Sequence, residues 1–193
     1  MITLRFDGLF RGLVETDSPK FIEGELRRAG ILCYGWVITR NGRVIAQGHG
    51  AFARARGATS NVAEYLALIE GLDALADMDV QSEAVEVIGD ARSIIEQMKG
   101  SASVSAQGIY PLYARASRLA HRFKKLHWSW KPRKYNKAAD LLSRRAIQQV
   151  RSSTSSYEEA LDRLGVSLKG KDGTRLVPLL DLRIYQARGL VIA

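Results

Sequence analysis

Four acidic residues stand in four separate segments of this 193-residue chain, each built to hold a carboxylate at a strand end or on a buried helix face. They are Asp7, Glu64, Asp90 and Asp140. If folding brought these carboxylates together, their mutual repulsion would raise their pKa values, and divalent cations would relieve it. Oxygen ligands without a convincing His or Cys set favour Mg²⁺ or Mn²⁺ over zinc. The pattern therefore predicts two such ions, about 4 Å apart, and hydrolysis of a phosphodiester bond by in-line displacement.

Two of the carboxylates follow predicted strands. In ITLRFDG the apolar side chains alternate, which predicts a half-buried strand that ends at Asp7, with Gly8 letting the backbone turn. The run AVEVIGD predicts a short buried strand that ends at Asp90. An aspartate after a strand is usually a turn residue, so the metal-site prediction depends on all four carboxylates together.

The other two carboxylates lie on predicted helices. Thr59 or Ser60 can cap a helix over residues 60–78, and Glu64 falls in its first turns. Asp140 lies on a helix predicted over residues 136–150. A helix that covers the sheet edge can bring its carboxylate to those that follow the strands.

The remaining elements predict an α/β domain. Residues 32–40 and 43–52 are rich in β-forming side chains, and Asn41-Gly42 between them is a strong hairpin signal. Further helices are predicted over 91–100 and 110–126, and a last strand over 127–133. The order β-β-β-α-β-α-α-β-α is typical of a mixed sheet flanked by helices.

The net charge of +9 is concentrated in one part of the chain. Residues 91–150 hold 13 Lys and Arg against two Asp and Glu, which favours a polyanionic partner such as nucleic acid over a merely solvated helix face. Arg118, Arg122 and Lys125 are expected near one side of the basic helix. Trp128 and Trp130 would point to one face of the last strand, where core packing is the default and stacking on nucleic acid the weaker alternative.

Length and composition suit one main domain with an appendage. With 46% hydrophobic residues, the chain can build a globular domain over residues 1–150 and a C-terminal extension over 151–193. No apolar run approaches the roughly 18 residues needed to span a bilayer, so we expect a soluble, cytoplasmic protein without a membrane partner. The single Cys33 excludes an internal disulfide and a Cys-based zinc cluster.

Over roughly residues 1–150 the chain resembles the type 1 ribonuclease H family. The matching segments are FDG, TSNVAEYLALIEGL, GDARSIIEQMKG and WKPRKYNKAADLLS. The resemblance implies a ribonuclease H-like fold with a five-stranded mixed sheet whose first three strands are antiparallel. It also implies cleavage of the RNA strand of RNA–DNA hybrids with two Mg²⁺ or Mn²⁺ ions, leaving 5′-phosphate and 3′-hydroxyl ends.

The same resemblance implies roles for the four carboxylates. Asp7 would bridge both ions, Asp140 would join it at the ion that activates water, and Glu64 and Asp90 would join it at the ion facing the leaving group. All four would be both metal ligands and catalytic residues.

The resemblance also implies contacts with the hybrid. They are assigned to Gly8, Thr59, Ser60 and Asn61. Many family members carry a histidine before the last aspartate; here Arg133 occupies its neighbourhood, and Arg133 and Asn136 are expected in a supporting role. A DNA nuclease of the same fold, or a non-catalytic nucleic-acid-binding domain, are the alternatives.

The C-terminal extension matches no motif of the family. Its stretch RSSTSS predicts a linker, followed by a short helix and a hairpin around 171–173. The apolar end needs a partner surface, either the main domain or a second copy of the chain, so the extension could support a homo-oligomer.

Overall fold

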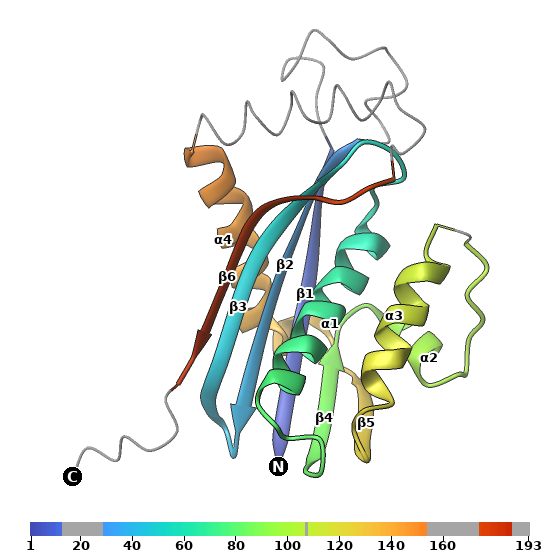
Figure 1. Ribbon diagram of the computed structural model, residues 1–193, viewed down its shortest axis with the longest axis vertical. Coiled ribbons are helices and arrows are strands. Elements are labelled where there is room, and N and C mark those ends of the chain that lie inside the picture. Colours follow the sequence, from blue (N-terminus) through green and yellow to red (C-terminus); the bar gives the residue numbers. More distant parts are fainter. Residues whose placement is uncertain (13–28, 107, 154–173, 187–193) are drawn as a thin grey trace, which may run out of the picture.

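A computed structural model describes residues 1–12, 29–106, 108–153 and 174–186 of the chain. Six strands form one mixed sheet in the order β5-β4-β1-β2-β3-β6, with helices on both faces (Figure 1). The elements are β1 Ile2–Gly12, β2 Gly30–Arg40, β3 Arg43–Arg54, α1 Ser60–Asp77, β4 Ala84–Gly89, α2 Arg92–Met98, α3 Tyr110–Ala120, β5 Lys125–Trp130, the 3₁₀ helix η3 Arg133–Tyr135, α4 Lys137–Ser152 and β6 Val177–Tyr185.

The first three strands are antiparallel, as predicted, and β4 and β5 run parallel to β1. The predicted hairpin between β2 and β3 is confirmed, because Asn41 and Gly42 have φ angles of 51° and 81°. Positive φ at both central residues is what a two-residue turn between twisted strands requires.

The core lies between the sheet and α1. This helix packs on β1 and β2, and α3 packs against it from outside. Ile2, Leu4 and Phe6 alternate along β1 and are fully buried on this face. On the other face, α4 covers β1, β2 and β3 with a stripe that includes Ala146, Ile147 and Val150.

Two predictions about β1, its end and the role of Gly8, are wrong. The strand does not end at Asp7 but continues to Gly12, so Asp7 lies in mid-strand opposite Gly35. Gly8 therefore makes no turn. A Cβ added at Gly8 would lie 2.2 Å from the backbone N of Glu64, so this glycine is required by the close approach of α1.

The region around β5 also differs from the prediction. Helix α3 ends at Ala120, and the chain turns so that Phe123 is buried before β5 begins at Lys125. Arg122 and Lys125 thus lie beyond the helix on which they were expected. The strand ends at Trp130 instead of residue 133, because Pro132 has no N–H to donate to a sheet.

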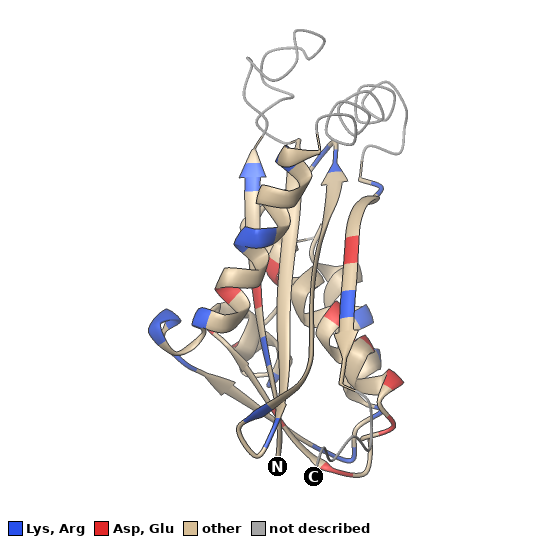
Figure 2. Ribbon diagram, turned by 90° about the vertical axis from the view of Figure 1, so that its left-hand side faces the viewer, with Lys and Arg blue, Asp and Glu red and all other residues tan. Residues whose placement is uncertain are grey.

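A sixth strand, absent from the predicted five, comes from the C-terminal extension. β6 pairs antiparallel with β3 and carries charges of both signs (Figure 2). Arg183 on β6 contacts Glu70 at 2.6 Å and Asp73 at 3.2 Å, both on α1. Part of the extension therefore packs on the main sheet. The linker predicted over residues 151–156 is wrong at its start, because α4 continues to Ser152. The rest of that linker, and the helix and hairpin predicted after it up to residue 173, lie outside the described residues.

Candidate active site

Three of the four predicted carboxylates converge at one place. Asp7 comes from the middle of β1, Glu64 from the first turns of α1, and Asp90 from the residue after β4. One carboxylate oxygen of each lies within 4.8 Å of the others. Strands β1 and β4 are parallel neighbours, and Arg5 is paired with Ile88. Side chains on one face recur every two residues, so Asp7 and Asp90, each two residues further on, lie side by side on the same face.

Glu64 reaches this point because Gly8 lets α1 lie against β1. The backbone N–H of Gly8 donates to the Glu64 carboxylate, and the Thr59 hydroxyl caps the helix by accepting from the backbone N of Val62 at 3.3 Å. The Oε2 atom of Glu64 is buried and has no hydrogen-bond partner among the described residues. A buried carboxylate oxygen without a partner is costly unless a cation satisfies it.

Burial raises the pKa of two of these carboxyl groups. For Asp7 burial is the largest cause, the Ser143 hydroxyl opposes it, and the charges of Asp90 and Asp140 add to it, giving a pKa of about 6. Burial also raises the pKa of Glu64 well above its ordinary value, with the charges of Asp7 and Asp90 as further causes. The charge of Arg133 lowers both pKa values but does not outweigh these causes, and the oxygen-only donor set fits a hard divalent cation.

Asp140 lies near this cluster but outside it. Its carboxylate contacts Arg133 and accepts from Nε of Arg144 at 2.9 Å. Burial raises the pKa of Asp140, yet hydrogen bonds from Arg144 and Arg133 outweigh burial and hold it below its ordinary value. The structure thus pairs the fourth predicted ligand with two guanidinium groups.

Helix α4 also contributes a hydrogen bond to the buried carboxylate of Asp7. The Ser143 hydroxyl donates to Oδ2 of Asp7 at 2.5 Å. The helix approaches β2 at Gly35, where an added Cβ would lie 2.5 Å from both the carbonyl oxygen of Ala139 and the backbone N of Ser143. Sequence reasoning missed Ser143 and Arg144, although their spacings of three and four from Asp140 place all three on one helix face.

Asn136 is a buried side chain that connects two elements of the site. Its side chain is fully buried, and its amide donates to the backbone oxygen of Phe6 at 2.8 Å and to Oδ1 of Asp90 at 3.0 Å. This side chain therefore ties β1 to the residue after β4 and orients Asp90. Arg133, by contrast, is 60% exposed and reaches Asp140 from the short η3 helix.

The other predicted nucleic-acid contacts fall into two groups. Thr59, Ser60 and Asn61 are exposed at the start of α1, the end of the helix that carries Glu64. Arg118, Arg122 and Lys125 are also exposed, but Lys125 pairs with Ala84 at the far end of β4 from Asp90. Five strand steps separate these ends, roughly 16 Å, so the basic group is not part of the carboxylate cluster.

Comparison with known proteins identifies similar sequences. The sequence pattern of the reverse transcriptase-like family matches residues 27–146, a span that begins after Asp7. The chain is 34% identical over 125 residues to the bifunctional protein Rv2228c of Mycobacterium tuberculosis, and the aligned segment covers 64% of this chain and 33% of that protein. It is 31% identical over 122 residues to ribonuclease HI of Halobacterium salinarum, and the aligned segment covers 63% of this chain and 59% of that protein. The chain thus spans about a third of the mycobacterial relative.

Solved structures share the arrangement of strands and helices. The N-terminal RNase H domain of Rv2228c aligns with a TM-score of 0.63 and 30% identity, covering 79% of this chain and 97% of that one. A metagenomic RNase H1, LC11, crystallised in complex with an RNA/DNA hybrid, aligns with a TM-score of 0.62 and 27% identity, covering 78% and 99%. The resemblance and the fold predicted from the motifs are confirmed.

Proposed function

The chain belongs to the reverse transcriptase-like family of ribonuclease H-like domains, and we propose that it is an endoribonuclease that hydrolyses the RNA strand of RNA–DNA hybrids. The products would carry 5′-phosphate and 3′-hydroxyl ends. The observation that carries the proposal is the convergence of Asp7, Glu64 and Asp90 from three elements within 4.8 Å. The similarity to ribonuclease HI of Halobacterium salinarum and to an RNase H1 crystallised with a hybrid supports the choice of substrate.

The donor set fits two Mg²⁺ or Mn²⁺ ions. Asp7, Glu64 and Asp90 would hold them, and Asp140 would join when its carboxylate leaves Arg133. Such ions, when bound, supply positive charge at the scissile phosphate and make water a stronger nucleophile. The unpartnered Oε2 of Glu64 and the raised pKa of Asp7 are the features that a cation would relieve.

Residues of the chain itself orient the carboxylates and the substrate. Ser143 fixes one oxygen of Asp7, and Asn136 fixes one oxygen of Asp90, so both carboxylates are held before any ligand arrives. Arg133 can exchange the Asp140 carboxylate for a phosphate of the hybrid, because a guanidinium group matches both anions in geometry.

The start of α1 suits discrimination between RNA and DNA. Thr59, Ser60 and Asn61 are exposed beside Glu64, where their polar groups can meet the minor groove of an A-like duplex. That groove is wide and displays the 2′-hydroxyl groups that only RNA carries. We therefore propose that this segment distinguishes the RNA strand from the DNA strand by contacting its 2′-hydroxyl groups.

Cleavage of a labelled RNA–DNA hybrid tests the proposal. Double-stranded RNA and double-stranded DNA are the control substrates, and each is incubated with Mg²⁺, Mn²⁺ or EDTA. We expect only the RNA strand of the hybrid to be cut, only with a divalent ion, and not at all by Asp90→Asn. Folded protein that binds the hybrid but leaves it intact with every ion would be a non-catalytic binding domain, and cleavage of double-stranded DNA would indicate a DNA nuclease.

The remaining expectations about partners are separate proposals. Among the described residues no helix is long and apolar enough to cross a membrane. Association of two copies through the C-terminal extension, and a location in the cytoplasm, stay predictions from the sequence.

A further inference from the structure

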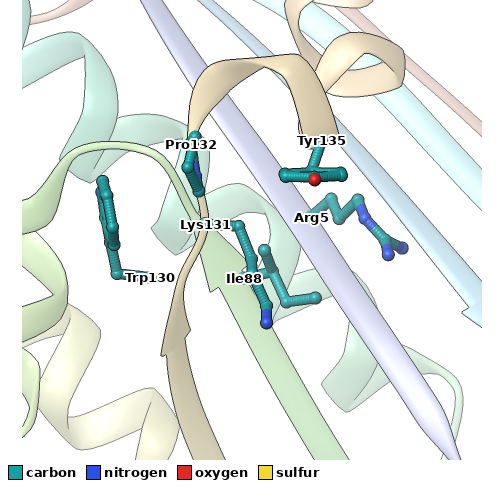
Figure 3. Close-up of a pocket in the computed structure, with 6 residues that line it drawn as sticks. All are labelled: Arg5, Ile88, Trp130, Lys131, Pro132 and Tyr135. Carbon is teal, nitrogen blue, oxygen red and sulfur yellow. The ribbon is translucent and has the colours of Figure 1, made fainter.

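A pocket of about 480 Å³ opens on the part of the sheet that α4 leaves uncovered (Figure 3). Its lining combines cationic, aromatic and apolar side chains, and none of the described residues that line it is acidic. The lining residues are Arg5, Ile88, Trp130, Lys131, Pro132 and Tyr135. Its volume lies within the range of about 300–1,000 Å³ that small-ligand sites occupy.

The pocket is built on the strands that carry the carboxylates. Arg5 on β1 pairs with Ile88 on β4, and each stands two residues before a carboxylate of the cluster, on the same face. Two strand residues span about 7 Å. Along a duplex strand, successive nucleotides rise by about 3.4 Å. A group in the pocket therefore lies within about two nucleotides of a phosphate held at the carboxylates.

Two aromatic rings stand on opposite sides of this pocket, with Ile88 and Lys131 between them (Figure 3). Trp130 is 42% exposed and Tyr135 is 59% exposed. Trp130 is held in place, because its indole N–H donates to the backbone oxygen of Asp90 at 3.0 Å and Arg92 lies 5.7 Å from its ring centre. The indole thus connects the pocket directly to a residue of the carboxylate cluster.

The charge of the pocket indicates an anionic ligand. Arg5 and Lys131 belong to the lining, and the Lys134 ammonium lies 4.9 Å from the ring of Tyr135 at its rim. Aromatic faces beside cations favour a ligand with both a flat π-system and a phosphate. In a duplex the flat faces of the bases are already stacked on one another, so only an unpaired base could use the rings.

We propose that this pocket binds one unpaired nucleotide of a nucleic-acid strand next to the phosphate held at the carboxylates. The base packs against Trp130 or Tyr135, and Arg5 and Lys131 bind its phosphate. The identity of the ligand rests on the proposed function, since the strand reaches the pocket from the cleavage site. The consequence is a preference for hybrids that end in a single-stranded extension close to the cut.

Binding of extended and blunt hybrids tests this preference. The full-length chain with Asp90→Asn, which is expected not to cleave, is titrated in Mg²⁺ against labelled hybrids that are blunt or carry a short unpaired extension at either end of the RNA strand. We expect one extension to tighten binding about tenfold, the scale of stacking one base on an aromatic ring. The readout is the ratio of the two dissociation constants, which a general loss of hybrid binding leaves unchanged.

Substitutions assign the preference to the pocket. Of Tyr135→Ala and Trp130→Ala, the variant that lacks the ring under the base is expected to lose most of the tenfold preference, and the double variant to lose all of it. Lys131→Ala is expected to reduce the salt dependence of extended-hybrid binding by about one ion. Tyr110→Ala removes an exposed ring on α3 and Lys99→Ala removes an exposed charge after α2, so both should keep the preference.

Two results would overturn the pocket assignment. One is equal binding of blunt and extended hybrids by the Asp90→Asn chain with its pocket intact; the other is a preference that persists when Trp130 and Tyr135 are also replaced by alanine. Because cleavage is not measured here, the two proposals fail separately. An active enzyme without the preference refutes the pocket alone, and an inactive protein that keeps the preference refutes the enzymatic function alone.

Discussion

Replacing Asp7 by asparagine is expected to stabilise the metal-free protein at neutral pH while abolishing cleavage. The side chain is 3% exposed, and burial is the largest cause that raises its pKa from an ordinary 3.8 to about 6. The folded protein therefore holds this proton more tightly than the unfolded chain does. As pH rises from 3.8 to about 6, the free energy of unfolding falls.

The size of the effect follows from the two pKa values. The charged carboxylate of Asp7 lowers the free energy of unfolding by about 3 kcal/mol at about pH 7.5, and by about 1 kcal/mol at about pH 4.5. Asparagine is neutral and of the same shape, and its side-chain oxygen can still accept from the Ser143 hydroxyl. Asp7→Asn should therefore gain about 3 kcal/mol at the higher pH and about 1 kcal/mol at the lower one.

Urea unfolding in EDTA, followed by circular dichroism at both pH values, measures this gain. Adding Mg²⁺ should then stabilise the unmodified chain more than the variant, because an ion that binds only the folded state raises its stability. Glu83→Gln is the control: it removes a carboxylate that is 45% exposed and paired with Arg40, and should change stability by less than about 1 kcal/mol at either pH. An Asp7→Asn variant that is no more stable than the unmodified chain would contradict burial as the cause of the raised pKa of Asp7. A gain in the free energy of unfolding that is equal at both pH values would contradict it as well.

Three further substitutions test other parts of the structure. Ser143→Ala removes the hydroxyl that stabilises the charged form of the Asp7 carboxylate. The acidic limb of the pH–cleavage profile should therefore move to higher pH by about one unit. A limb that does not move would contradict a role for this hydrogen bond. Gly35→Ala should destabilise the fold by about 3 kcal/mol or more in urea unfolding, because α4 backbone atoms lie 2.5 Å from the added Cβ, whereas Gly108→Ala has open space and should be neutral. Arg183→Ala leaves buried Glu70 without its cation and should cost about 3–5 kcal/mol near neutral pH. The loss should shrink in acid, where the carboxyl takes up a proton, and equal losses at both pH values would refute the ion-pair explanation.

Local structure could be predicted where neighbours in sequence decide it. Alternation of apolar side chains predicts β1, a short apolar run predicts β4, and Asn41-Gly42 predicts the turn that the two positive φ angles confirm. Thr59 caps α1, as its hydroxyl and position suggested. Each of these features depends on interactions within a few residues, so the residue types are sufficient.

The wrong boundaries have causes distant in the chain. A glycine after an aspartate resembles a turn, but Gly8 is required by the backbone of α1, which packs directly on it. Nothing local to residues 177–185 indicates which strand they join, because any exposed edge offers the same row of N–H and C=O groups. The ion pairs of Arg183 with α1 and the hydrogen bond that the Tyr34 hydroxyl donates to Asp181 make the pairing of β6 with β3 specific.

The sequence by itself determined which carboxylates could form a metal site, since the types and segments of Asp7, Glu64, Asp90 and Asp140 are visible without coordinates. Only the tertiary structure decided that the first three converge within 4.8 Å while Asp140 is paired with arginine side chains. The physical reason is that oxygen–oxygen distances across elements depend on how closely α1 and α4 approach the sheet. That approach is set by packing between backbones, which no local pattern encodes.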